Sequence, residues 1–128
     1  MGDRALIQLE STEGLSPALY LHWSGRHVPE LLDGLAQQMK SRGPDLPYWT
    51  ARMIGRACNM NGGDSECMSV GVWDQDEVLT IKNSMGDAGV FVLNIDTNTV
   101  RYGGGYTPNI ASDSPLTWTQ MPTAYAAA

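Results

Sequence analysis

Residues 18–42 read ALYLHWSGRHVPELLDGLAQQMKSR, and within this stretch the hydrophobic period changes from two residues to about three and a half. Residues 18–23 alternate between apolar and polar side chains, as in a strand with one buried face. After a short loop, Pro29 is suited to the first turn of a helix. Apolar residues then recur at helical spacing, at Leu31, Leu32, Leu35 and Met39. The stretch therefore predicts a strand followed by a helix.

Patterns on both sides of this stretch extend the same architecture. Ala5, Ile7 and Leu9 lie on one face of a predicted strand at residues 4–10, which we expect to pair with residues 18–23 as a hairpin. A second helix is predicted from about Pro47 to Asn59, after the helix-ending pair Gly43-Pro44. Further strands are predicted at 68–73, 78–81, 90–95 and 100–102.

The predicted order of elements, ββααβββ, indicates an α+β domain. We expect an antiparallel sheet of five or six strands with two helices on one face. Residues 1–105 are predicted to form this single domain, because no linker divides them. Residues 106–128 contain three prolines and little periodicity, and predict an irregular C-terminal tail docked on the domain.

The charge of the chain narrows the class of partner. The 128 residues carry a net charge of −6, which argues against direct binding to nucleic acid or to an anionic membrane. Seven of the 14 acidic residues, but one of the eight basic residues, lie between Asp64 and Asp96. This segment alone carries a charge equal to that of the whole chain, so the expected partner is another protein with a basic surface.

The N-terminus and the cysteines bear on the compartment. No positively charged start is followed by an apolar run, and no stretch approaches the ~20 apolar residues that span a bilayer. We therefore expect a cytoplasmic protein. In a reducing compartment Cys58 and Cys67 are expected to be free thiols, although two cysteines also allow one bridge.

Five acidic residues in two predicted turns form the candidate binding surface: Asp64, Glu66, Asp74, Asp76 and Glu77. Side chains in turns are usually exposed, so the two turns are expected to form a negative patch if their strands are adjacent. The spacing of a calcium-binding loop, with its central glycine, is absent. The alternative interpretation is that these acids only keep a small domain soluble.

A second candidate is a pocket near Arg4, Tyr20 and His22. A histidine can act as a general base or a metal ligand because its pKa lies near neutrality. His22 and His27, however, do not have the spacing of a metal site, and a half-buried histidine bonded to its neighbours is the simpler interpretation. No catalytic residue, metal ligand or cofactor is therefore predicted, and we expect a protein that is not an enzyme.

The segments Gly2-Asp3-Arg4-Ala5 and Tyr20-Leu21-His22-Trp23-Ser24-Gly25 resemble a set of small uncharacterised proteins of bacteria and phages. Those proteins open Gly-Asn-Arg-Ala and carry a Tyr-Leu-His-Trp-Asn/Asp-Gly segment. Later segments are similar in order and spacing, and the likeness covers roughly residues 2–102. Ser24 departs from the usual Asn or Asp. The resemblance implies a phage or mobile-element setting and supplies no activity.

These observations favour a non-enzymatic protein-binding domain. The specific hypothesis is a phage or mobile-element inhibitor of a host defence system such as CRISPR interference, in which an acidic face occupies a basic nucleic-acid channel. One alternative is a small enzyme or ligand-binding protein that uses the pocket near Tyr20 and His22. Another is a structural or oligomerising protein, for example a homodimer, that uses an open sheet edge.

Overall fold

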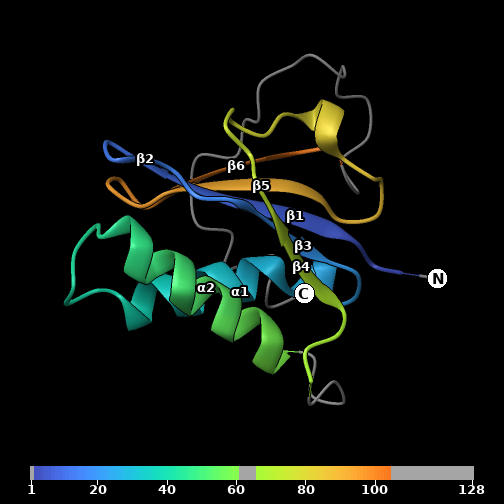
Figure 1. Ribbon diagram of the computed structural model, residues 1–128, viewed down its shortest axis with the longest axis horizontal. Helices are drawn as coiled ribbons and strands as arrows, with labels where there is room; N and C mark the ends of the chain where they lie inside the picture. Colours follow the sequence, from blue (N-terminus) through green and yellow to red (C-terminus); the bar gives the residue numbers. More distant parts are fainter. Residues whose placement is uncertain (1, 61–65, 105–128) are drawn as a thin grey trace.

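The computed structural model describes residues 2–60 and 66–104, and it contains one six-stranded sheet and two α-helices (Figure 1). The strands are β1 (Ala5–Ser11), β2 (Gly14–Leu15), β3 (Ala18–Leu21), β4 (Val70–Trp73), β5 (Gly89–Asn94) and β6 (Thr99–Gly103). The helices are α1 (Val28–Gln38) and α2 (Leu46–Met60), with short 3-10 turns η1 (Gly25–His27) and η2 (Ile81–Asn83). The predicted α+β class is confirmed, with both helices on one side of a mostly antiparallel sheet.

The strand order is β4-β3-β1-β5-β6, with β2 paired to the end of β1. The predicted hairpin is confirmed, because β1 and β3 pair antiparallel with Ile7 opposite Leu19. The centre of the sheet differs from the expectation, since β1 and β5 run parallel from Ala5↔Gly89 to Glu10↔Asn94. The helices connect β3 to β4, which runs in the same direction as β1, and residues 74–88 then cross the opposite face of the sheet to β5. A crossover of this kind lets β5 run in the direction of β4, and therefore parallel to β1.

The main core lies between the sheet and the two helices. Ala5, Ile7 and Leu9 point toward the helices, as their alternation predicted. They pack with residues of β3, β5 and both helices, including Leu19, Leu21, Leu32, Leu35, Met53, Phe91 and Leu93. The predicted helical stripe is therefore confirmed as the buried face of α1.

The opposite face of the sheet carries a second, smaller core, which consists of Leu6, Ala18, Leu79, Ile81, Val90 and Val92. The predicted strand at 78–81 is wrong, since residues 78–80 have no strand partner and Ile81 begins η2. Thr80 and Asn83 cap this turn with their side chains, a local pattern that competes with strand pairing. Leu79 and Ile81 are still buried, because this segment covers the sheet (Figure 1).

Gln8 attaches the covering segment to the sheet. Its side chain is fully buried in the centre of β1. Its Oε1 accepts a hydrogen bond from the Leu79 N–H at 2.9 Å, and its Nε2 donates to the carbonyls of Glu77 at 3.2 Å and Ser16 at 3.3 Å. One polar side chain thus satisfies backbone groups from two separate segments.

A disulfide joins Cys58, in the last turn of α2, to Cys67, which precedes β4. The expectation of free thiols is wrong. The two Cα atoms lie 5.0 Å apart, within the range that a disulfide needs, because the fold brings the end of α2 beside the start of β4. Their separation of nine residues in the chain did not reveal this proximity.

We predict that Gln8→Leu lowers the free energy of unfolding by about 3 kcal/mol, because the Leu79 N–H and two carbonyls lose their partner in a buried place. The Leu79 amide should also exchange its hydrogen faster. Denaturant unfolding and hydrogen exchange measure the two effects. The matched control is Gln37→Leu on the exposed side of α1, which should change stability by less than about 0.5 kcal/mol. Equal stability of the two variants would contradict the role given to Gln8.

Candidate interaction surface at the β4 edge

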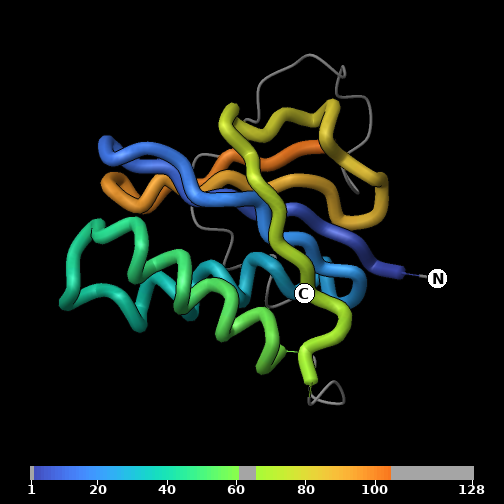
Figure 2. Tube along the Cα trace, viewed as in Figure 1, coloured from blue at the N-terminus to red at the C-terminus, as the bar shows by residue number. Residues whose placement is uncertain are grey.

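β4 is an edge strand. β3 pairs with it on one side, and within residues 2–60 and 66–104 no strand lies on the other (Figure 2). The His22 N–H donates to the Ser69 carbonyl at 3.0 Å, so this pair is a hydrogen-bonded pair of the antiparallel ladder. Because bonded and non-bonded pairs alternate, the N–H and C=O groups of Val70 and Val72 point away from β3.

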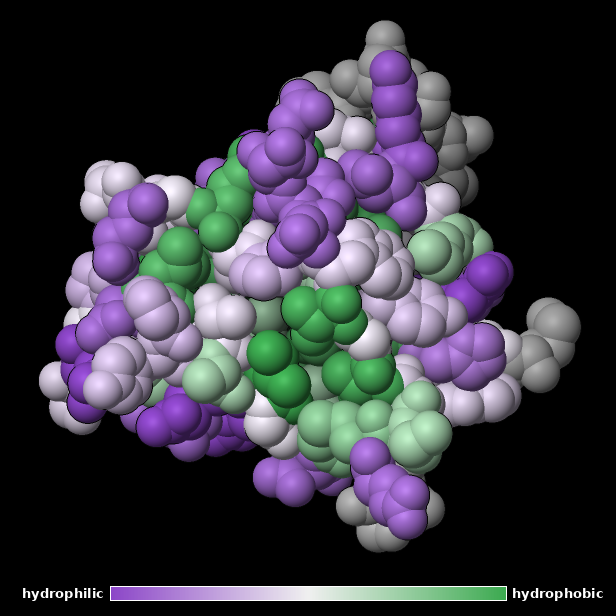
Figure 3. Space-filling model, in the orientation of Figure 1, coloured by the Kyte–Doolittle hydropathy of each residue, from purple (hydrophilic) through white to green (hydrophobic). Residues whose placement is uncertain are grey.

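Apolar side chains surround this edge. Val72 is 47% exposed, Trp73 40% and Met68 79%, whereas Ile54 and Val70 are half-buried against the main core. Figure 3 shows hydrophobic side chains gathered along β4 and the adjoining part of α2, on the face toward the viewer. Contiguous exposed apolar side chains of this kind often indicate an interaction site.

A row of aromatic rings continues from β4 across the face of the sheet opposite the helices. The Trp73 ring stacks on Tyr20, with ring centroids 5.7 Å apart and 27° between the planes. The Tyr20 hydroxyl is hydrogen-bonded to His22 Nδ1 at 2.7 Å. The ring centroids of His22 and Trp23 lie 4.9 Å apart, with the two planes nearly perpendicular. Tyr20 and His22 of the candidate pocket are thus neighbours within this row.

The acidic residues flank the edge strand at its two ends. Glu66 is exposed and precedes β4, while Asp74, Asp76 and Glu77 are exposed and follow it. Asp64 lies outside the described residues. The two turns are separated by the length of β4, about 10 Å at the rise of a strand.

A hollow of about 620 Å³ adjoins the acidic turn after β4. It is lined by Gly14, Leu15, Pro17, Asp74, Gln75 and Asp76. Pro17 precedes the residue that pairs with Trp73, so the hollow lies where the β3–β4 pair ends. Two carboxylates are therefore positioned beside a space that a long basic side chain can enter.

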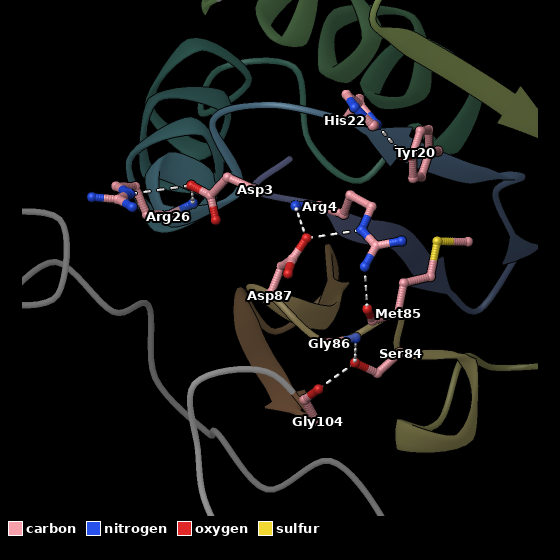
Figure 4. Close-up of polar contacts among 10 residues, drawn as sticks. All are labelled: Asp3, Arg4, Tyr20, His22, Arg26, Ser84, Met85, Gly86, Asp87 and Gly104. Atoms are coloured by element: carbon pink, nitrogen blue, oxygen red, sulfur yellow. Dashed lines mark hydrogen bonds and ion pairs between the residues drawn. The ribbon is translucent and has the colours of Figure 1, made fainter. Parts of the chain in front are cut away.

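Arg4, the third residue of the candidate pocket, is held by the turn that precedes β5 (Figure 4). Its Nε donates to Asp87 Oδ2 at 2.8 Å, its backbone N–H donates to the same oxygen at 3.0 Å, and its Nη2 donates to the Met85 carbonyl at 2.8 Å. The hydrogen bond from the Arg4 side chain, followed by that from its backbone, lowers the pKa of the Asp87 carboxyl. Asp87 in turn raises the pKa of the Arg4 guanidinium, first by hydrogen bonding and then by its charge. Arg4 is therefore engaged in holding the turn.

The conformation of the loop after β3 explains which residues suit positions 24 and 25 in the segment that resembles the bacterial and phage proteins. Ser24 has a φ of 68°, in the left-handed region that Asn and Asp enter more readily than Ser. Gly25 is buried, and a Cβ at this position would lie 2.4 Å from the carbonyl oxygen of Asp3. The loop thus needs a glycine at position 25 and favours Asn at position 24.

The described residues contain a second cavity, which is separate from the candidate pocket. This cavity, of about 640 Å³, lies between α1 and α2 and is lined by His27, Glu30, Leu31, Gln38, Arg56, Asn59 and Met60, so it does not reach Tyr20 or His22. In the described part of the chain, no three His, Cys, Asp or Glu residues are grouped to hold a metal ion. No helix there is both long and apolar enough to cross a bilayer.

Comparisons with protein-family models, with curated proteins and with solved structures found no match to this chain.

Sequence reasoning missed the outward backbone groups of Val70 and Val72 and the exposed ring of Trp73. It predicted a strand here and left open which strand of the sheet would lie at an edge. The one available signal was that Glu66–Trp73, ECMSVGVW, contains no Lys, Arg or Pro, the residues that commonly protect a sheet edge.

We predict that Asp87→Asn lowers the melting temperature at pH 7. The difference in melting temperature between the variant and the unchanged protein should become smaller in acid. Because the pKa of Asp87 is lowered in the folded state, its stabilising effect is complete above the ordinary aspartate pKa of about 4 and is lost as the pH falls through the lowered value. Thermal unfolding between pH 7 and pH 2 measures the difference. A difference that stayed constant down to the lowest pH would contradict the ion pair with Arg4.

Proposed function

We propose that this protein is a non-enzymatic protein-binding domain whose partner presents a basic surface. The observation that carries the proposal is the exposed apolar edge of β4 with acidic residues at both ends, Glu66 before it and Asp74, Asp76 and Glu77 after it. Apolar contact at the centre of such a surface supplies affinity, while the charges at its rim accelerate the encounter and select the partner.

The hollow beside Asp74 and Asp76 supports the same proposal. A Lys or Arg side chain of the partner can place its apolar stem against Leu15 and Pro17 and its charged end beside the two carboxylates. In the segment from Asp74 to Asp96, Lys82 is the single basic residue, so little positive charge within that segment competes with the partner.

The narrower hypothesis is an inhibitor from a phage or mobile element that occupies a basic nucleic-acid channel of a host defence protein. The same surface suits this role, and the hypothesis stays a prediction. The cytoplasmic location also stays a prediction. The Cys58–Cys67 disulfide counts against it, because such bonds persist mainly in oxidising compartments.

An enzyme or small-ligand protein that uses Arg4, Tyr20 and His22 has weaker support. The hydrogen-bonding groups are used within the protein, since Arg4 is bonded to Asp87 and Met85, and Tyr20 is bonded to His22. The two cavities described above are lined by other residues.

We predict that Asp74→Lys combined with Asp76→Lys abolishes preference for basic partners while the domain stays folded. The measurement is selection of peptides from a random library on the immobilised full-length protein. The unchanged protein should enrich peptides rich in Lys and Arg, and their affinity should fall as salt is added. The double variant should weaken binding of these peptides by about tenfold at low salt, because two attractive charges become repulsive.

The matched control is Glu30→Lys combined with Asp33→Lys on α1, which changes the net charge by the same amount away from β4. The control variant should enrich the same peptides as the unchanged protein. Circular dichroism should show the same fold for all three proteins. Enrichment of neutral or acidic peptides, no enrichment at all, or equal loss in the control variant would each contradict the proposal.

A further inference from the structure

We propose that the β4 edge binds an extended segment of the partner as an additional strand of the sheet, and that this segment alternates basic and apolar side chains. The inference rests on the proposed function, and it adds the mode of binding and a sequence pattern for the partner. Strand addition obtains affinity from backbone hydrogen bonds and specificity from alternate side chains.

The backbone of β4 is available for such pairing. Val70 and Val72 each direct one N–H and one C=O away from β3, two residues apart, which is the repeat that an added strand needs. Neither residue forms another backbone hydrogen bond within the described part of the chain. Natural edge strands are usually protected by Lys, Pro or a bulge, whereas β4 reads VGVW.

The side chains on the two faces of β4 determine the pattern. On the helix side, Val72 is exposed beside the half-buried Val70, so this side favours apolar residues in an added strand. On the opposite side, Trp73 presents its ring and is followed by Asp74. A Lys or Arg over that ring makes a cation–π contact and reaches the carboxylates. Because successive side chains of a strand point to opposite faces, apolar and basic residues should alternate.

Charge favours a basic segment over a second copy of this chain. If β4 of one protomer paired antiparallel with β4 of its partner, the Glu66 end of each strand would meet the end carrying Asp74, Asp76 and Glu77. Parallel pairing would place identical acids side by side. Like charges across a strand pair are destabilising, and a Lys-containing segment reverses the sign of these contacts.

The test compares Val72→Pro with Val72→Ala. Because the N–H of Val72 points outward, proline removes this donor and leaves the ladder with β3 intact, as is tolerated on edge strands. Alanine removes the apolar side chain and keeps the donor. The probe is the acetylated peptide amide Lys-Val-Lys-Val-Lys-Val-Lys, together with its analogue that is N-methylated at the valines and a second analogue N-methylated at the lysines.

The expected result is that Val72→Pro binds the peptide about fivefold or more weakly than Val72→Ala, since it loses a backbone hydrogen bond as well as side-chain contact. One N-methylated analogue should bind much more weakly than the other, because a strand directs alternate amides toward its neighbour. The peptide analogues test the proposal on the unchanged protein even if Val72→Pro fails to fold.

Equal binding by the proline and alanine variants, or equal binding of the two analogues, would overturn strand addition. So would slow hydrogen exchange of the Val72 amide in the free full-length protein, which would show that the chain covers its own edge. A dimer in sedimentation experiments that Val72→Pro dissociates would assign the edge to a second copy.

If Asp74→Lys with Asp76→Lys weakens peptide binding while Val72→Pro does not, the proposed function stands and strand addition fails. If the charge variant has no effect, the proposed function itself fails.

Discussion

The hydrogen bonds of the buried Gln8 side chain constrain the rest of the sheet. They hold the segment after β4 against the face opposite the helices, where Leu79 and Ile81 complete the second core. Because both faces of the central strands are covered, β5 can be buried from Gly89 to Leu93 and can pair parallel with β1. The segment that covers this face is also the one that leaves the sheet after Trp73. Within residues 2–60 and 66–104, β4 therefore has β3 as its single strand neighbour.

This arrangement brings acidic side chains, apolar side chains and outward backbone groups together at the β4 edge. Four of the acidic residues, Glu66, Asp74, Asp76 and Glu77, lie in the segments where the chain enters and leaves β4. Between them, Val72 and Trp73 of this four-residue strand are exposed. The disulfide between Cys58 and Cys67 anchors the start of the strand to α2. The result is a backbone edge, an apolar surface and a rim of negative charge in one place.

Part of the candidate site was readable from the chain, and part was not. The clustering of acids between residues 64 and 96 is a property of the sequence, and Glu66, Asp74, Asp76 and Glu77 are exposed as residues in turns usually are. Their position at opposite ends of one strand depends on where that strand lies. The contact between Arg4 and Asp87 was not readable from the chain, because the two residues are distant in sequence and no local pattern connects them. The burial of Gln8 was not readable either, because the alternation within β1 does not show that a distant segment covers the second face of the sheet.

The sequence by itself determined the class of fold, the hairpin of β1 and β3, the two helices and the buried faces of these elements, because the hydrophobic periods of strands and helices are local properties. Tertiary structure alone decided the parallel pairing of β1 with β5, the disulfide, the burial of Gln8 and the position of β4 at the edge. Each of these depends on which distant segments meet, and a pattern confined to neighbouring residues contains no such information. For this protein the candidate functional surface belongs to the second group, since an edge exists only after the order of the strands is established.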